Sequence, residues 1–177
     1  MKRGFTMIEL IFVIVILGIL AAVALPKFIG VASQAREGNL KSFTGTLNGT
    51  IGPSWWSKAM PYDGNVSKLN IDSTTVLQTY TDVPKEMASF NLDKCDDPSV
   101  YKVVGTFDKT KIGTKVNYYL ACKDGTASEA PKFLLVKGKT AGSDTLNLGD
   151  ANSSTISNSE INFTDGSTKE TFIVVQK

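Results

Sequence analysis

The hydrophobic positions of this 177-residue chain are concentrated at its N-terminus. Between Phe5 and Leu25 the only polar residues are Thr6 and Glu9. A helix of this length measures about 31 Å at 1.5 Å per residue, which matches the hydrocarbon core of a bilayer. The pattern predicts a membrane-spanning helix, followed by a segment of ordinary soluble composition that is rich in Thr, Ser, Asn, Asp and Lys.

A helical period continues beyond Pro26 as an amphipathic pattern. Apolar residues recur at steps of three and four, namely Leu40, Phe43, Leu47, Ile51 and Trp55. Residues 27–60 are therefore expected to form a helix that packs one face against a globular head. Because Pro26 lacks an N–H and clashes with the carbonyl four residues earlier, we expect a kink or local melting near residues 22–26. Gly18 makes unwinding there easier.

From about Met60 the pattern changes to turns and short strands. The predicted strands are Val100–Phe107, Lys115–Cys122, Lys132–Val136, Glu160–Phe163 and Thr171–Gln176. Apolar residues of the second strand alternate with Asn117, Tyr119 and Ala121, which is typical of a half-buried strand. The short connections favour an antiparallel sheet with one face packed on the amphipathic helix. The predicted fold class is thus α+β, with a long N-terminal helix on a C-terminal β-sheet head.

The segments between these strands carry turn and loop patterns. Tyr62–Asn65 and Lys123–Thr126 are predicted tight turns, because each contains an Asp-Gly pair. Val83–Glu86 contains a proline where a short helix could begin. Gly138–Ser159 is polar and has no period, so we expect an exposed loop.

Charge and its position fix the expected orientation in the membrane. Lys and Arg total 19 and Asp and Glu total 17, with no basic block that would suit a nucleic-acid partner. Lys2 and Arg3 precede the apolar helix, and no comparable cluster follows directly after it. The positive-inside rule then keeps the N-terminus in the cytoplasm and sends the rest across the membrane.

That orientation places the two cysteines, Cys95 and Cys122, outside the cytoplasm, where disulfides persist. A bridge between them closes a loop of about 28 residues, worth roughly 3.5 kcal/mol in the chain-entropy model. The alternative is a pair of free, buried thiols.

Composition argues against catalysis. The chain has no histidine, which removes the commonest general base and the commonest metal ligand, and no other catalytic arrangement is evident. We therefore predict a protein that is not an enzyme and has no cofactor.

Asp93, Asp96 and Asp97 cluster near Cys95, but their spacing matches no EF-hand loop, so solvated turn residues are the favoured interpretation and no metal site is predicted. For Trp55 and Trp56 we favour buried aromatics over a sugar-stacking surface.

Three interpretations of the N-terminal segment compete. It could be a secretory signal peptide cut after Ala22-Val23-Ala24, a plain membrane anchor, or a helix that is retained after a short leader is removed at Gly4. Glu9 favours the third, because a carboxylate in an apolar segment costs about 2.5–3.5 kcal/mol at mid-bilayer. A helix that must find a charged partner has a reason to carry that cost.

The run Gly4-Phe5-Thr6-Met7-Ile8-Glu9-Leu10, followed by the apolar stretch, resembles the N-terminal signature of type IV pilins and type II secretion pseudopilins. The resemblance is strong over roughly the first 30 residues. It implies a prepilin whose leader, residues 1–4, is removed by a prepilin peptidase after Gly4, with Phe5 then N-methylated. It also makes Glu9 the carboxylate that guides assembly, by pairing with the free amine of Phe5 in a neighbouring subunit, and places Gly18 and Pro26 at helix-loosening positions.

A weaker resemblance to MSHA-type pilins rests on Leu25-Pro26-Lys27-Phe28-Ile29, Ala35-Arg36 and Trp56-Ser57-Lys58-Ala59. Together these resemblances imply a structural subunit of a homo-oligomeric filament used in surface attachment, with a type II secretion pseudopilin as the alternative. The implied partners are prepilin peptidase, an inner-membrane assembly platform and, before assembly, membrane lipid. The expected location is the bacterial inner membrane, then a periplasm-spanning or cell-surface pilus. The expected organisation is a leader (1–4), an assembly helix (5–26), its amphipathic continuation (27–60) and the head (61–177).

Overall fold

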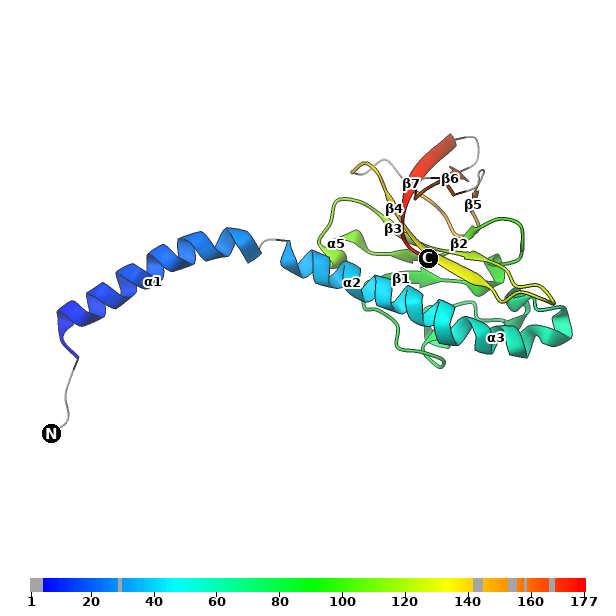
Figure 1. Ribbon diagram of the computed structural model, residues 1–177, viewed down its shortest axis with the longest axis horizontal. Helices are drawn as coiled ribbons and strands as arrows, with labels where there is room; N and C mark the ends of the chain where they lie inside the picture. The colour runs from blue at the N-terminus through cyan, green and yellow to red at the C-terminus, as the bar shows by residue number, and fades with distance from the viewer. Residues whose placement is uncertain (1–4, 29, 142–144, 153–155, 158, 166–167) are drawn as a thin grey trace.

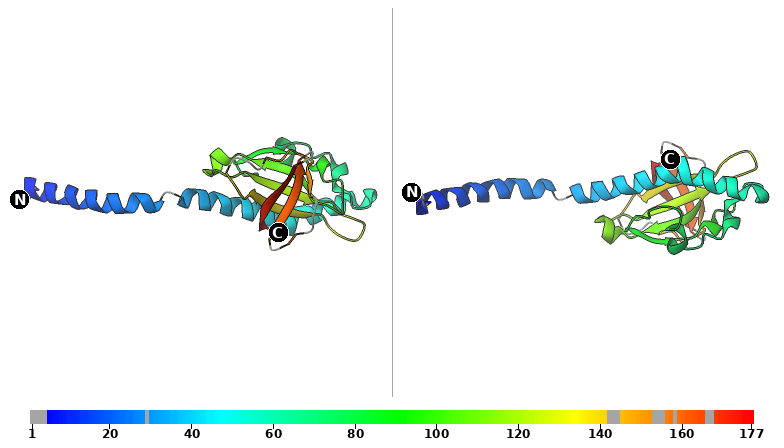
Figure 2. Two further views of the ribbon diagram at one scale, coloured as in Figure 1. Left: turned by 90° about the horizontal axis from the view of Figure 1, so that it is seen from above. Right: turned by 90° about the horizontal axis from the view of Figure 1, so that it is seen from below.

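A helical arm extends away from a rounded α+β head in the computed structural model, which describes residues 5–28, 30–141, 145–152, 156–157, 159–165 and 168–177 (Figure 1). The arm is α1 (Met7–Phe28), and the N-terminus lies at its far end from the head. The same separation is seen from above and from below (Figure 2). Leucine, isoleucine and valine dominate α1, so its sequence provides no polar face to distinguish one side from another.

The second helical stretch runs along the head without interruption. It comprises α2 (Val31–Thr46), a π-helical turn η1 (Leu47–Ile51), α3 (Gly52–Ala59) and the 3₁₀ turn η2 (Met60–Tyr62). The junction residues Thr46, Ile51 and Met60 all have right-handed helical dihedrals, so the path continues through each junction.

The π turn is where the helix accommodates Pro53. Proline cannot donate the usual hydrogen bond to the carbonyl four residues earlier. The N–H of Gly52 bonds instead to the carbonyl of Leu47, five residues back. A wider turn of this kind shifts the bonding pattern by one residue, and the helix resumes as α3.

The predicted melting near residues 22–26 is wrong in its position. The chain is α-helical through Pro26 to Phe28, and the helix changes direction after that point. Gly30, with φ of 109°, begins α2 in a left-handed conformation that favours glycine. Pro26 removes one N–H donor near the end of α1 and leaves most of the helix intact. The positive φ of Gly30, by contrast, is incompatible with a continuous right-handed helix.

The head contains one antiparallel sheet in the order β1-β2-β3-β4-β7-β6-β5. An additional pairing of β5 with β2 brings the sheet back onto itself, so that β1 and β5 share one edge of β2. The strands are β1 (Met87–Phe90), β2 (Lys102–Phe107), β3 (Tyr118–Lys123), β4 (Lys132–Gly138), β5 (Ala151–Asn152), β6 (Glu160–Asp165) and β7 (Thr168–Gln176). Two short helices, η3 (Val66–Leu69) and α4 (Thr74–Leu77), lie between the long helical stretch and β1, whereas η4 (Leu92–Lys94) connects β1 to β2 and α5 (Lys109–Ile112) connects β2 to β3.

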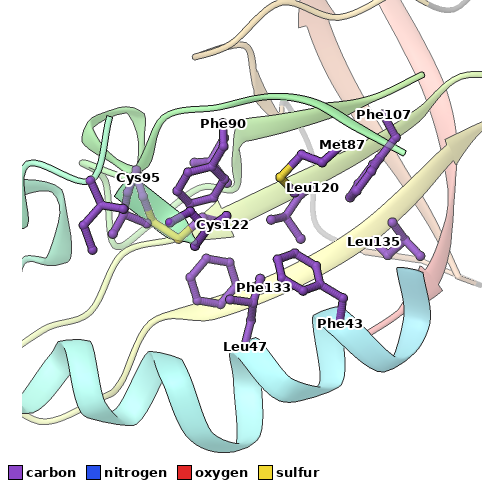
Figure 3. Packing of buried hydrophobic residues seen from close by; sticks show 14 of the residues in the cluster. Phe43, Leu47, Met87, Phe90, Cys95, Phe107, Leu120, Cys122, Phe133 and Leu135 are labelled. Carbon is purple, nitrogen blue, oxygen red and sulfur yellow. A yellow bond between two sulfur atoms is a disulfide. The ribbon is translucent and has the colours of Figure 1, made fainter. Parts of the chain in front are cut away.

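The main core lies between α2–α3 and one face of the sheet, as predicted (Figure 3). Leu40, Leu47 and Trp55 of the apolar stripe are fully buried, Phe43 is nearly so, and Ile51 packs at the margin. From the sheet side, Leu120, Phe133 and Leu135 face them. The predicted α+β class, with the helix on an antiparallel sheet, is therefore confirmed.

A second core covers the opposite face, where the sequence suggested solvent. Tyr119 and Ala121 of β3 pack there with Phe163 of β6 and Phe172 of β7, and Leu146 joins them from the β4–β5 connection. Strand β3 is therefore buried on both faces rather than on one. The prediction of an exposed loop over Gly138–Ser159 is wrong in part, because Leu146 is buried and β5 lies within that segment.

Two smaller predictions also fail. Val83–Glu86 begins no helix but leads directly into β1, which hydrogen-bonds to β2. Lys123–Thr126 is not a tight hairpin turn, because β3 ends at Lys123 and β4 begins only at Lys132. The predicted turn at Tyr62–Asn65 is present, with left-handed residues at Asp63 and Gly64.

The disulfide and one charged cluster attach the helices to the sheet. Cys95, just after η4, bonds to Cys122 on β3 with a Cα–Cα distance of 5.4 Å, which confirms the predicted bridge. On α2, Glu37 accepts a 2.5 Å hydrogen bond from the Tyr118 hydroxyl. The Nζ atoms of Lys41 and Lys137 lie 2.9 and 3.5 Å from the same carboxylate.

Candidate assembly site on the N-terminal arm

The arm exposes apolar side chains on all of its sides. Exposed fractions include 67% for Phe12, 57% for Leu17, 60% for Leu20 and 66% for Leu25. The 19 residues from Met7 to Leu25 form a helix long and apolar enough to cross a membrane, and none of that stretch is buried in the head. A core helix of a soluble protein or an N-terminal signal sequence would pass the same test of length and composition. Unlike a core helix, α1 leaves an apolar surface that its own head does not cover.

Glu9 lies at the N-terminal end of α1 and forms a capping box with Thr6. Its Oε2 accepts hydrogen bonds from the backbone N–H of Thr6 at 2.8 Å and from the Thr6 hydroxyl at 2.7 Å. The Glu9 N–H in turn points to the Thr6 hydroxyl oxygen at 3.4 Å. These reciprocal contacts satisfy N–H groups that the first helical turn leaves without partners.

The capping box holds Glu9 in a defined position before any partner arrives. Its negative charge lies at the positive end of the helix dipole, which reduces the cost of carrying it into an apolar environment. Among the described residues, both of these hydrogen bonds go to Oε2, and Oε1 remains available for another donor. Phe5, whose amine is the expected partner in a neighbouring copy, is 85% exposed beside it.

Thr6 is the site residue that the sequence argument did not assign. Its signal was the spacing Thr-x-x-Glu at the start of an apolar run, which is the capping-box pattern. Of the other predicted positions, Gly18 lies on the exposed surface of α1, where a methyl group would meet no atom within 4 Å. Pro26 lies within α1, and Gly4 falls outside the described residues.

The acidic residues near Cys95 lie in ordinary turn and ion-pair positions. Asp96 pairs with Lys102 at 2.6 Å, and Asp97 accepts a hydrogen bond from the N–H of Ser99 at 2.7 Å. Across the part of the chain that the structure describes, no group of three or more His, Cys, Asp or Glu side chains is arranged to hold a metal ion.

The two adjacent tryptophans are structural, as expected. Trp55 is fully buried and meets the rings of Tyr80 and Phe133 edge-on, with centroids 5.8 and 6.1 Å away. Trp56 is half-buried and donates its Nε1–H to the carbonyl of Thr126 at 2.7 Å. This bond holds the β3–β4 connection against the end of α3.

Asp124 is a strongly perturbed carboxyl group of the head. It is only 4% exposed, and its Oδ1 accepts hydrogen bonds from the N–H groups of Val66 and Gly125 at 2.9 and 2.8 Å. Burial raises its pKa to about 6, and the charges of Asp96 and Asp97 add to that shift against the lowering effect of the two hydrogen bonds. Asp124 lies at the start of the β3–β4 connection and links it to η3 through Val66.

Comparison with known proteins finds similarity over short stretches of the chain. Residues 1–25 match the family described as "Prokaryotic N-terminal methylation motif". The chain is also similar to the type IV narrow pilus major component PilA5 of Thermus thermophilus, with 53% identity over 38 residues. That stretch is 22% of this chain and 33% of the relative, so the chain spans about a third of the relative's length. No solved structure matches the chain.

Proposed function

Because the first 25 residues carry the N-terminal methylation motif of the type IV pilin family, we propose that this chain is a prepilin that assembles into a type IV pilus-like filament. Prepilin peptidase cuts between Gly4 and Phe5 and the new N-terminus is methylated. The remaining chain is organised as an assembly helix (5–26), its amphipathic continuation (27–60) and a head (61–177). The processed subunit is anchored by α1 until the inner-membrane assembly platform adds it to the growing filament.

One observation carries the proposal: α1 is apolar on every side, unburied by its own head, and bears a single carboxylate near its end. A membrane covers such a helix in the precursor, and the helices of neighbouring copies cover it in a filament. Burial of each large side chain contributes about 1.5–3 kcal/mol. Close helix approach is favoured by Gly18 and by the nearby alanines 21, 22 and 24.

Glu9 sets the register between copies. A charge in the apolar centre of the filament is costly unless it is paired, so the free amine of Phe5 in a neighbouring subunit is its complement. The capping box leaves Oε1 of Glu9 for that amine while Oε2 stays bound to Thr6. Pairing of this kind selects one axial position among the many that a uniformly apolar helix would allow.

The experiment compares Glu9→Gln with Glu9→Ala and Thr6→Ala in cells that produce filaments. Glutamine retains the capping box but lacks the charge, whereas Thr6→Ala weakens the cap and retains the charge. Leaving one member of a buried pair alone costs about 3–5 kcal/mol. We therefore expect both Glu9 variants to reach the membrane fraction normally and to be lost from sheared filaments, and Thr6→Ala to lose less.

The opposite result separates the two roles of Glu9. If Glu9→Gln assembles like the wild type while Glu9→Ala and Thr6→Ala both fail, the carboxylate acts only as a helix cap and the pairing model is wrong.

A pseudopilin of a type II secretion system is the second candidate, because it shares the same N-terminal chemistry. The partial resemblance to MSHA-type pilins supports a surface filament used in attachment. Electron microscopy of a deletion strain distinguishes the two. Loss of surface filaments supports the pilin, whereas loss of exoprotein secretion with filaments intact supports the pseudopilin.

A further inference from the structure

The end of the head nearest to α1 is formed by α5 and the start of α2 (Figures 1 and 2). Arg36 on α2 donates a 2.6 Å hydrogen bond from Nη1 to the carbonyl of Lys111 on α5. A methyl group on Gly113 would lie 3.5 Å from Arg36 Nη1 and 3.9 Å from the Cβ of Ser33. Thus α5 is fixed beside the first turns that follow the break at Gly30, wherever α1 points.

This end of the head is positively charged. Five cations gather there, and we name them the basic collar: Arg36, Lys85, Lys109, Lys111 and Lys115. Lys85, Lys111 and Lys115 are exposed, and Lys111 Nζ lies 3.3 Å from the carbonyl oxygen of Lys85. Among the described residues, the five ion pairs within 4 Å all involve other lysines.

Two carboxylates lie close to the collar and offset part of its charge, since the charge of Lys111 acts on Asp108. Asp108 caps α5, and its Oδ1 accepts hydrogen bonds from the N–H and hydroxyl of Thr110 at 2.8 and 2.6 Å. Glu86 precedes β1 and bonds through its carbonyl to the N–H of Asp108. At the opposite end of the head, by contrast, Lys132 is paired with Glu129 and Lys102 with Asp96.

The collar lies about one Debye length outside the headgroup layer of the anchored precursor, because Arg36 is eleven residues, or about 16 Å along a helix, beyond Leu25 at the end of the membrane-spanning stretch. The exposed apolar surface continues past the membrane-spanning stretch to Phe28, 69% exposed, and Val31, 51% exposed. Arg36 is five residues beyond Val31, which is about 7–8 Å along a helix. The headgroup layer adds roughly 5–7 Å on each side of the hydrocarbon core, and the Debye length is about 8 Å at physiological ionic strength.

We propose that the basic collar binds anionic phospholipid headgroups of the leaflet facing the head, and thereby holds the head against the membrane before assembly. This inference rests on the proposed function, because it requires that α1 be retained as the anchor. Unpaired lysines at an anionic surface each contribute up to about a fivefold shift toward the docked state. The break at Gly30 gives the head the freedom to tilt toward the surface. Extraction of a subunit into a filament then includes release of the collar from lipid.

The test uses the full chain in vesicles of phosphatidylcholine with or without phosphatidylglycerol at about one third of the lipid. A water-soluble acylating reagent modifies the lysines, and mass spectrometry gives the rate for each. Lys68 and Lys94 are exposed elsewhere on the head and serve as references within the same molecule. We expect Lys109, Lys111 and Lys115 to react about fivefold more slowly than these references with phosphatidylglycerol present, and at the same rate without it or in 0.5 M salt.

Matched variants identify the cause. The pair Lys111→Gln with Lys115→Gln should restore the reactivity of Lys109, whereas Lys68→Gln with Lys94→Gln should not. Equal rates in both vesicles would overturn the proposal. So would protection that is independent of phosphatidylglycerol, because it would assign the collar to contacts between copies of the chain.

Failure of the proposed function is detected separately. Protein recovered from cells with its N-terminus after Ala24 would lack α1 and refute the prepilin assignment. An intact anchor without lipid-dependent protection would refute the lipid contact alone.

Discussion

The arm and the head contain the same apolar residue types, but the head buries these side chains within its own chain and the arm does not. The head covers both faces of its central strand β3, one with α2–α3 and the other with β5–β7. The arm leaves its leucines, isoleucines and valines exposed and relies on a membrane or on other copies to remove them from water. Stability of the head is thus a property of one chain, whereas stability of the arm is a property of its surroundings.

The difference also extends to the polar groups. In the head, charged side chains link neighbouring elements, as Glu37 does between α2, β3 and β4. In the arm, the one carboxylate is held by its own helix through Thr6. Substitutions in the two regions should therefore have separate consequences, with head variants changing unfolding and arm variants changing insertion or assembly.

The largest expected difference comes from a core residue in each region. Phe133→Ala removes a fully buried ring between Leu47 and Trp55 and should lower the free energy of unfolding by about 3–5 kcal/mol. Leu20→Ala on α1 should leave that free energy unchanged and weaken filaments instead. Urea unfolding of the full chain in mild detergent, followed by tryptophan fluorescence, measures the free energy of unfolding of both variants. Equal losses for the two variants would mean that the arm is part of the cooperative unit.

Asp124 provides a pH test that only the head should show. The pKa of its carboxyl group is about 6 in the folded state and 3.8 in the unfolded chain. The folded state therefore binds more protons between these values, and this group makes stability fall as the pH rises from about 4 to 6. The full effect is about 2–3 kcal/mol.

Comparison with Asp124→Asn isolates that effect. Asparagine keeps an acceptor for the N–H groups of Val66 and Gly125 but cannot ionise. The variant should be more stable than the wild type at pH 8, and the difference should vanish near pH 4. If the free energy of unfolding changed with pH in the same way for the two proteins, ionisation of Asp124 would not lower the stability of the head.

The smallest expected change in stability comes from substituting two helical glycines that lie in open space. A methyl group on Gly38 of α2 or on Gly18 of α1 would meet no atom within 4 Å. Gly38→Ala should raise the stability of the head by about 0.5–1 kcal/mol, because alanine has the higher helix propensity. Gly18→Ala should leave head unfolding unchanged, and thermal unfolding of both variants is the check. A stabilised head in Gly18→Ala would contradict the independence of the two regions.

The parts of the fold that were predictable have strong local patterns. The apolar run after Phe5 and the stripe from Leu40 to Trp55 have fixed periods, and the structure confirms the helices they predict. The second core was not predictable, because Leu146, Phe163 and Phe172 come from separate segments of the chain that meet only when β5–β7 curl over the sheet. Strands β1 and β5 were missed for the same reason, since four and two residues are too few to show alternation.

Candidate site residues divide in a similar way. Glu9 stands out in sequence because it is the one charge in the apolar run, whereas the role of Thr6 was signalled only by the short Thr-x-x-Glu spacing and is established by the hydrogen bonds in the structure. The break at Gly30 was assigned to Pro26, because proline is the more obvious helix breaker. Backbone conformation at a glycine is decided by the surrounding structure and leaves no trace in the sequence.

The most direct test of the central claim is the mass of the N-terminal peptide of the protein isolated from membranes or sheared filaments. Loss of residues 1–4 with one methyl group added to Phe5 is the predicted result, because both the pairing of Glu9 and the retention of α1 require that N-terminus. A chain that begins after Ala24 would contradict the account, since the arm would then be a discarded signal peptide and the head a secreted protein.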